Sequence, residues 1–93
     1  MDKVEARDLL EEFLDDLKSR SREELLGLIS HPVYIEKTGR SGTVYQIEYE
    51  AVWDSEPGGD LRIIASIDDG GFRSALKPLT ADFLVSFQGM VVE

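Results

Sequence analysis

Alternate positions sort into two faces along the stretch 43–54, which reads TVYQIEYEAVWD. The odd positions from Tyr45 to Trp53 are aromatic or aliphatic, whereas the even positions mix valine with glutamine and glutamate. A period of two in this composition is typical of a half-buried antiparallel strand, because successive side chains point to opposite sides of the backbone. We therefore expect this stretch to form the central strand of a sheet.

Helical periodicity precedes that strand. Apolar residues recur every three or four positions over 3–18, with acidic residues between them, which predicts an amphipathic helix. Ser21 and Glu24 have the spacing of a capping box and predict the start of a second, short helix. Pro32 should end that helix at or before His31, because the residue before a proline disfavours helical geometry.

Two further strands are expected on either side of the central one, over 33–37 and 61–68. If Ile35 is to share a face with the buried side of the central strand, it can lie opposite Ile47. The intervening loop then needs an odd number of unpaired residues, because a slip by one residue would move Ile35 to the other face.

A fourth strand is expected after a tight turn at Asp69 and Gly70, since an Asp-Gly pair is a strong hairpin signal. In the last part, 81–93, the short apolar runs fit a strand or a helix. We favour a strand, with Gln88-Gly89 turning into Met90-Val91-Val92. The expected hairpin at Asp69-Gly70 would place Ile67 opposite Phe72, Ala65 opposite Ser74 and Ile63 opposite Leu76.

Together these elements predict the α+β class: two N-terminal helices packed on one face of a four- or five-stranded antiparallel meander sheet. The 93 residues leave room for a single domain over 1–93. Trp53 is expected in the core between helix and sheet.

The chain is acidic, with 19 aspartates and glutamates against 10 lysines and arginines and a net charge of −9. Such a surface repels phosphate backbones and argues against nucleic-acid binding.

No cysteine is present, so disulfides and cysteine-ligated metals are excluded. A basic leader and a long apolar run are both missing, and we expect a cytoplasmic protein that does not enter membranes.

The face of the sheet opposite the helices carries the candidate binding residues, because it mixes apolar and charged side chains. It is expected to be solvated, covered by the C-terminal segment, or an interface such as a symmetric dimer through sheet faces or edge strands. The residues selected as a candidate binding surface are Tyr34, Glu48, Glu50, Arg62, Ile64 and Arg73.

Catalytic and metal-binding patterns are weak. Glu48 and Glu50 form a carboxylate pair, but Arg62 nearby suggests cross-strand ion pairs rather than acid and base roles. His31 is the only histidine and has no partner in its local sequence. The acidic loops lack the ligand spacing of a calcium site. We therefore predict no catalytic residue, no metal and no cofactor.

The run from Trp53 to Ser86, WDSEPGGDLRIIASIDDGGFRSALKPLTADFLVS, is similar to a set of small uncharacterised bacterial proteins. The shared features are an aromatic-Asp pair, Pro-Gly-Gly-Asp, Ile-Asp-Asp-Gly-Gly, an aromatic-Arg pair and Pro-Leu-Thr. This resemblance implies no activity. A helix followed by a curved antiparallel sheet also resembles the cystatin-like and NTF2-like group, which implies a helix-on-sheet fold.

Two functional hypotheses follow. The first is a small non-enzymatic interaction or ligand-binding protein that uses the outer sheet face and is dimeric or binds another protein. The alternative is a reduced NTF2-like small-molecule binder or enzyme, with a pocket between the first helix and the sheet.

Overall fold

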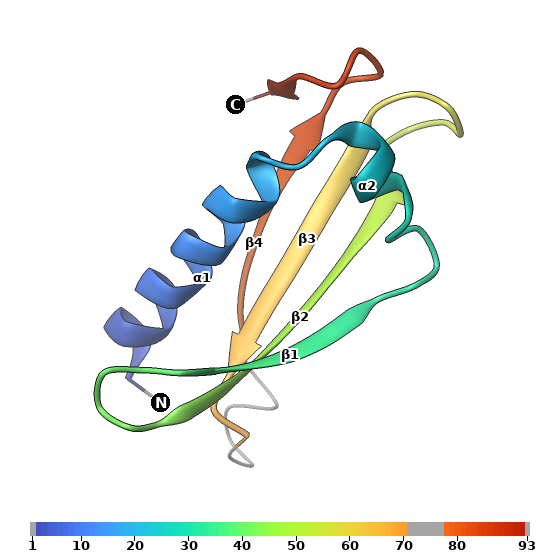
Figure 1. Ribbon diagram of the computed structural model, residues 1–93. Helices are drawn as coiled ribbons and strands as arrows, with labels where there is room; N and C mark the ends of the chain where they lie inside the picture. The colour runs from blue at the N-terminus through green and yellow to red at the C-terminus, as the bar shows by residue number, and fades with distance from the viewer. Residues whose placement is uncertain (1, 71–77, 93) are drawn as a thin grey trace.

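The computed structural model describes residues 2–70 and 78–92, and these residues form two helices and a five-stranded sheet (Figure 1). The fold is α+β, as the sequence predicts. Its elements are α1 (Lys3–Lys18), α2 (Arg22–Leu26), β1 (Val33–Thr38), β2 (Val44–Trp53), β3 (Leu61–Asp68), β4 (Leu79–Val85) and β5 (Val91–Val92).

Helix α1 has the predicted bounds and the predicted apolar stripe. Asp2 caps it by accepting hydrogen bonds from the backbone N–H groups of Val4 and Glu5, each at 3.1 Å. The helix packs mainly on β3 and β4 (Figure 1). Its buried residues are Ala6, Leu10, Phe13, Leu14 and Leu17.

Helix α2 starts where the capping box predicted. The Ser21 hydroxyl accepts a hydrogen bond from the Glu24 backbone N–H at 3.2 Å, and the helix ends at Leu26, before His31. It spans only five residues and buries Leu25. The expectation of two helices on the sheet is therefore met in part: α1 lies along the sheet, whereas α2 sits at one end of it (Figure 1).

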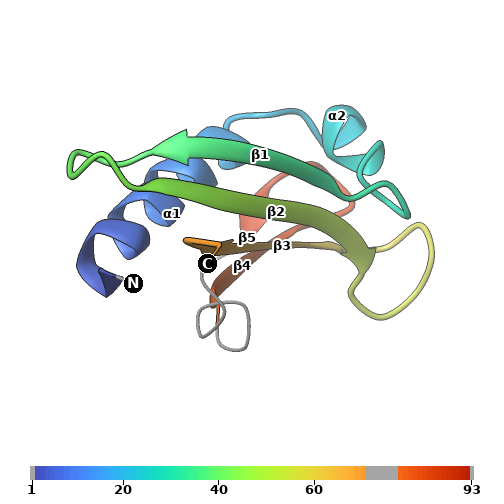
Figure 2. The same cartoon turned by 90° about the horizontal axis from the view of Figure 1, so that it is seen from below.

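The sheet is an antiparallel meander in which each strand pairs with the next one along the chain, in the order β1-β2-β3-β4-β5. Ile35 lies opposite Ile47, which is one of the pairs that the parity argument allowed. Thr38 and Val44 are the last paired residues of the two strands, and five residues, an odd number as the parity argument requires, connect them. Figure 2 shows the curved sheet from below.

The predicted pairing of β3 was wrong. Ile67 lies opposite Leu79, Ala65 opposite Ala81 and Ile63 opposite Phe83. A turn does begin at the predicted place, since Gly70 has a φ of 77° and donates its N–H to Asp68 Oδ1 at 2.7 Å. The strand expected over 72–76 lies outside the described residues. The prediction assumed a two-residue turn, whereas eleven residues, 68–78, separate Ile67 from its partner Leu79.

The C-terminal part forms strands, as favoured from the sequence. Gly89 turns the chain at a φ of 87°, and β5 then pairs with β4 through Val85 and Val91. Glycine suits this turn because the left-handed region costs it no steric penalty.

The core lies between α1 and the face of the sheet that carries the odd positions of β2, called here the inner face. Tyr45 and Ile47 are fully buried on it, whereas Trp53 at the end of the strand is half-buried and packs at the margin of the core. Trp53 is therefore less central than expected. The largest fully buried side chains are Tyr45, Leu17, Leu25, Ile47, Leu61, Ile63, Ile67 and Val85.

Candidate functional site

The opposite side of the sheet, called here the outer face, carries the even positions of β2 and their cross-strand neighbours. Its side chains are exposed or half-buried, and Tyr34 is 69% exposed. β5 extends the sheet beside β4 and does not fold over this face. Its described residues are Tyr34, Glu36, Thr38, Val44, Gln46, Glu48, Glu50, Val52, Arg62, Ile64, Ser66, Asp68, Thr80, Asp82, Leu84 and Val92.

The register brings five of the six predicted binding residues together. Tyr34 lies directly opposite Glu48, and Ile64 lies directly opposite Glu50. Arg62 occupies the next outer position of β3 and faces Val52. The sixth, Arg73, lies outside the described residues.

Tyr34 lies beside the two glutamates on this face. The negative charge of Glu48 raises the pKa of the Tyr34 phenol, with further contributions from desolvation, a hydrogen bond to Glu48 and the charge of Glu50. The phenol is therefore held neutral as a hydrogen-bond donor beside two carboxylates. An aromatic ring with a polar tip of this kind is common at protein interfaces.

Arg62 does not pair with these glutamates, contrary to the expected cross-strand ion pairs. Its Nε donates to Asp54 Oδ1 at 2.9 Å, its Nη2 lies 2.7 Å from the same oxygen, and its Nη1 bonds to Asp82. These two carboxylates raise the pKa of Arg62. Among the described residues, Glu48 and Glu50 therefore have no cationic partner on this face.

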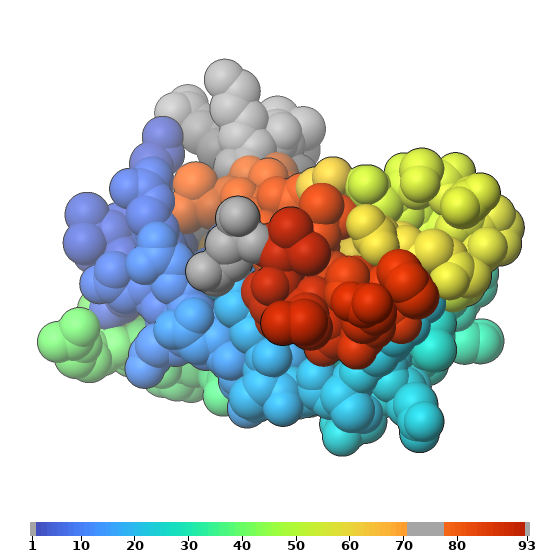
Figure 3. All heavy atoms as spheres, turned by 90° about the horizontal axis from the view of Figure 1, so that it is seen from above, coloured from blue at the N-terminus to red at the C-terminus, as the bar shows by residue number. Residues whose placement is uncertain are grey.

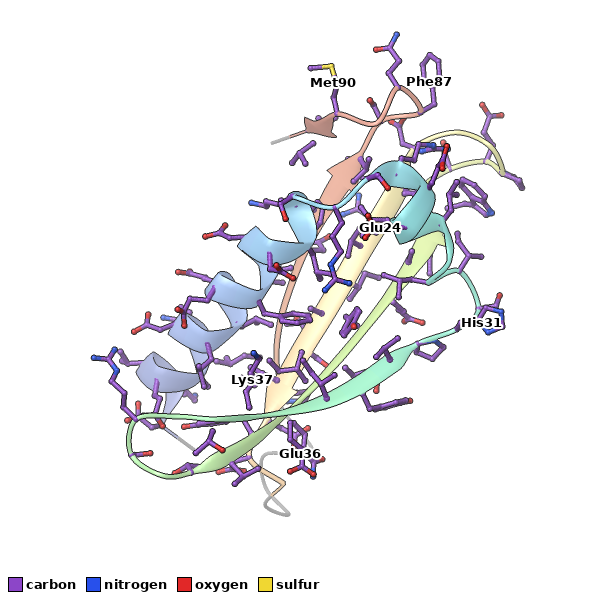
Figure 4. The ribbon with its side chains drawn as sticks, in the orientation of Figure 1. Glu24, His31, Glu36, Lys37, Phe87 and Met90 are labelled. Atoms are coloured by element: carbon purple, nitrogen blue, oxygen red, sulfur yellow. The ribbon has the colours of Figure 1, made fainter. Side chains whose placement is uncertain are left out.

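The alternative hypothesis placed a pocket between α1 and the sheet. Two open hollows, of about 910 and 390 Å³, lie along α1 beside β1 and the loop after it. Leu9 and Phe13 line the smaller hollow with Lys37, which extends from β1 toward α1 in Figure 4. Carboxylates of α1, among them Glu12 and Asp16, make up much of the remaining wall.

His31 is exposed, and Figure 4 shows it on the loop before β1, directed away from the sheet. In residues 2–70 and 78–92 no three His, Cys, Asp or Glu side chains are grouped so as to hold a metal ion. Neither described helix is long and apolar enough to cross a membrane.

One exposed apolar patch was not predicted from the sequence. Phe87 and Met90 flank the turn between β4 and β5 and are 64% and 66% exposed; Figure 4 shows both directed away from the core. Figure 3 shows this turn between α2 and the β2–β3 loop. A signal was present in the sequence, because the Gln88-Gly89 turn has a large apolar residue on each side.

Arg22 of α2 holds this end of the molecule together. Its Nη1 donates to the Ser86 carbonyl at 3.2 Å, and its Nη2 donates to the Gly59 carbonyl at 2.9 Å. The guanidinium also lies 5.8 Å from the centre of the Trp53 ring. One side chain therefore links α2, the β2–β3 loop and the β4–β5 turn.

Comparisons with protein-family models, with curated proteins and with solved structures found no match to this chain. The resemblance to cystatin-like and NTF2-like proteins stays a prediction, and function has to be argued from the surface itself.

Proposed function

We propose that this chain is a non-enzymatic interaction protein whose outer sheet face binds a basic segment of another protein. The observation that carries the proposal is the arrangement of Tyr34, Glu48 and Glu50. An exposed aromatic ring lies against two carboxylates, and the nearest described cation on the face, Arg62, is bound to Asp54 and Asp82.

Apolar side chains beside these carboxylates define the rest of the partner's chemistry. Val52 is the next outer residue of β2 after Glu50 and is 36% exposed, and the half-buried Ile64 lies opposite Glu50, whereas Val44, which is 46% exposed, lies four residues before Glu48. Such a surface suits an extended segment that carries both basic and apolar residues on one side, because only every second side chain of such a segment faces the sheet. Its charges would meet the glutamates, while its apolar side chains would cover the valines and the Tyr34 ring.

Binding of a labelled peptide with the repeat Lys-Ser-Val-Ser, which sets lysine and valine on one side of an extended chain, tests this proposal by fluorescence anisotropy. We expect the Glu48→Lys, Glu50→Lys double variant to bind at least tenfold more weakly, and salt to weaken the wild-type complex. The matched control is Glu11→Lys, Glu12→Lys, which makes the same charge change at exposed positions of α1.

An equal loss in both double variants would show that the peptide responds only to net charge, and the proposal would fail. A loss confined to the α1 variant would move the binding surface to the hollows beside that helix. Urea melts of each variant must match the wild type, so that weaker binding is not caused by unfolding. Capture from a bacterial lysate with the same variants then identifies the partner.

The small-molecule alternative is supported by the 390 Å³ hollow, where Leu9 and Phe13 supply an apolar wall and Lys37 a cation. A thermal-shift screen of metabolites tests it. A ligand that stabilises the wild type but not Lys37→Gln would favour this alternative over the sheet face.

A further inference from the structure

In the part of the chain that the structure describes, no strand lies beyond β1, and the backbone groups along that edge follow a defined pattern. Gly39 donates its N–H to the Thr43 carbonyl at 2.8 Å, which makes this directly opposed pair a hydrogen-bonded one. Such pairs alternate along an antiparallel ladder, so the odd residues of β1 bond to β2 and the even ones point their N–H and C=O groups outward. The outward-pointing residues are Tyr34, Glu36 and Thr38.

We propose that a second copy of this chain pairs with β1 along this edge, antiparallel and with the two-fold axis at Ile35. The two five-stranded sheets would then form one continuous sheet. This inference is independent of the proposed binding to the outer face, because it uses the edge of the sheet rather than its surface.

Charge and residue type favour this register over its neighbours. With the axis at Ile35, Tyr34 faces Glu36 of the second copy, Val33 faces Lys37, and Ile35 faces its own copy on the inner side. An axis at Glu36 would place two glutamates directly opposite, and an axis at Lys37 would oppose two lysines. Like charges in such positions are destabilising.

An axis at Tyr34 is also disfavoured, because it would bring Pro32 opposite Glu36. Proline has no N–H to contribute to the new ladder. The register centred on Ile35 is therefore the one that uses all of 33–37 without opposing like charges. It also covers Val33 and Ile35, which are half-buried in the single chain.

Pairing through the outer faces is the less favourable way to form a dimer. It would bring Glu48 and Glu50 of both copies together, with Arg62 of each already bound to Asp54 and Asp82. Edge pairing avoids that contact and leaves both outer faces open. It does set Glu36 of each copy on the same face, about 7–8 Å apart along the diagonal, so salt should strengthen the dimer.

Disulfide trapping tests the register, since the chain contains no cysteine of its own. Directly opposed residues of a non-hydrogen-bonded pair have Cβ atoms about 4.5–5.5 Å apart, close enough to be bridged with a small adjustment. Ile35→Cys should form a covalent dimer under mild oxidation at least tenfold faster than Lys37→Cys. Equal rates would indicate random collision and overturn the register.

Mass measurement tests the dimer itself. Sedimentation equilibrium of the wild type should give twice the 10.4 kDa chain mass, and a single-chain mass at every concentration would refute the proposal. Glu36→Pro removes an outward N–H and should give a single-chain mass, whereas Glu36→Ala should remain dimeric. Circular dichroism of both variants shows whether the sheet is retained, and a Glu36→Pro dimer with an intact sheet would count against the edge.

Discussion

The Tyr45 hydroxyl donates a 2.8 Å hydrogen bond to Oε1 of Glu5, and this bond ties the buried face of β2 to the first turn of α1. The same carboxylate also receives the hydroxyl and backbone N–H of Ser41, at 2.7 and 3.0 Å. One side chain on the helix therefore positions both the central strand and the β1–β2 loop.

Alkaline pH should weaken the fold through Tyr45. Burial, the bond to Glu5 and nearby carboxylates raise the pKa of this phenol to about 12, against an ordinary value near 10. Because the unfolded chain loses this proton first, stability should fall as pH rises from 10 toward 12. Urea melts between pH 9 and 11 measure the slope. Tyr45→Phe should flatten it, while Tyr34→Phe should leave most of it; an unchanged slope in Tyr45→Phe would contradict this assignment.

Gly39 should resist substitution because of Glu5. A Cβ added at Gly39 would lie 2.5 Å from Cδ and Oε1 of Glu5, so alanine there must displace the carboxylate from Ser41 and Tyr45. We expect Gly39→Ala to lower the urea midpoint. In a Glu5→Ala background the same substitution should cost less than half as much, because the clash and the hydrogen bonds are already gone. Strict additivity in this double-mutant cycle would show that the two residues do not interact.

Arg22→Met should loosen the end of the molecule that carries Phe87 and Met90. The variant keeps an apolar stem but loses the bonds to the Ser86 and Gly59 carbonyls. We expect a loss of about 1–3 kcal/mol in stability and faster hydrogen exchange at 54–60 and 86–90. Arg22→Lys should fall between, since one ammonium group does not reach both carbonyls. A change within about 0.5 kcal/mol, the range of ordinary surface substitutions, would show that the link is dispensable.

Core substitutions should follow burial rather than side-chain size. Leu17 is fully buried, and Leu17→Ala should cost about 2–5 kcal/mol in a denaturant melt. The larger Trp53 is half-buried at the end of β2, so Trp53→Ala should cost less than Leu17→Ala. The reverse order would place Trp53 in the centre of the core, as first expected from the sequence.

Local patterns were enough to predict most elements. The helix over 3–18, the cap at Ser21 and the alternation in β2 each depend on a few neighbouring residues, and all three are present. Parity correctly required an odd number of loop residues, and Ile35 opposite Ile47 is one of the pairs that it allowed. The predicted partner of Ile67 was wrong because it depended on the length of the loop between β3 and β4. The Asp-Gly pair suggested a shorter loop than the one in the structure.

In the candidate site, too, features set by neighbouring residues were predictable, and contacts between distant segments were not. Strand parity placed Tyr34, Glu48 and Glu50 on one face, and the register confirms that position. The partners of Arg62 were not predictable, since Asp54 comes from a loop and Asp82 from β4, whose register was misassigned. Exposure of Phe87 was not predicted, because it depends on where β4 ends, and Phe87 lies in the turn after Val85.

The meander order also bears on how the chain reaches its native state. Every strand pairs with its neighbour in sequence, so the sheet can grow hairpin by hairpin with little loss of chain entropy at each step. Docking of α1 on β3 and β4 is different, because it brings together segments separated by the first two strands. We expect this docking to be the slow step of folding, with α1 variants such as Leu17→Ala slowing refolding more than variants in the β1–β2 loop.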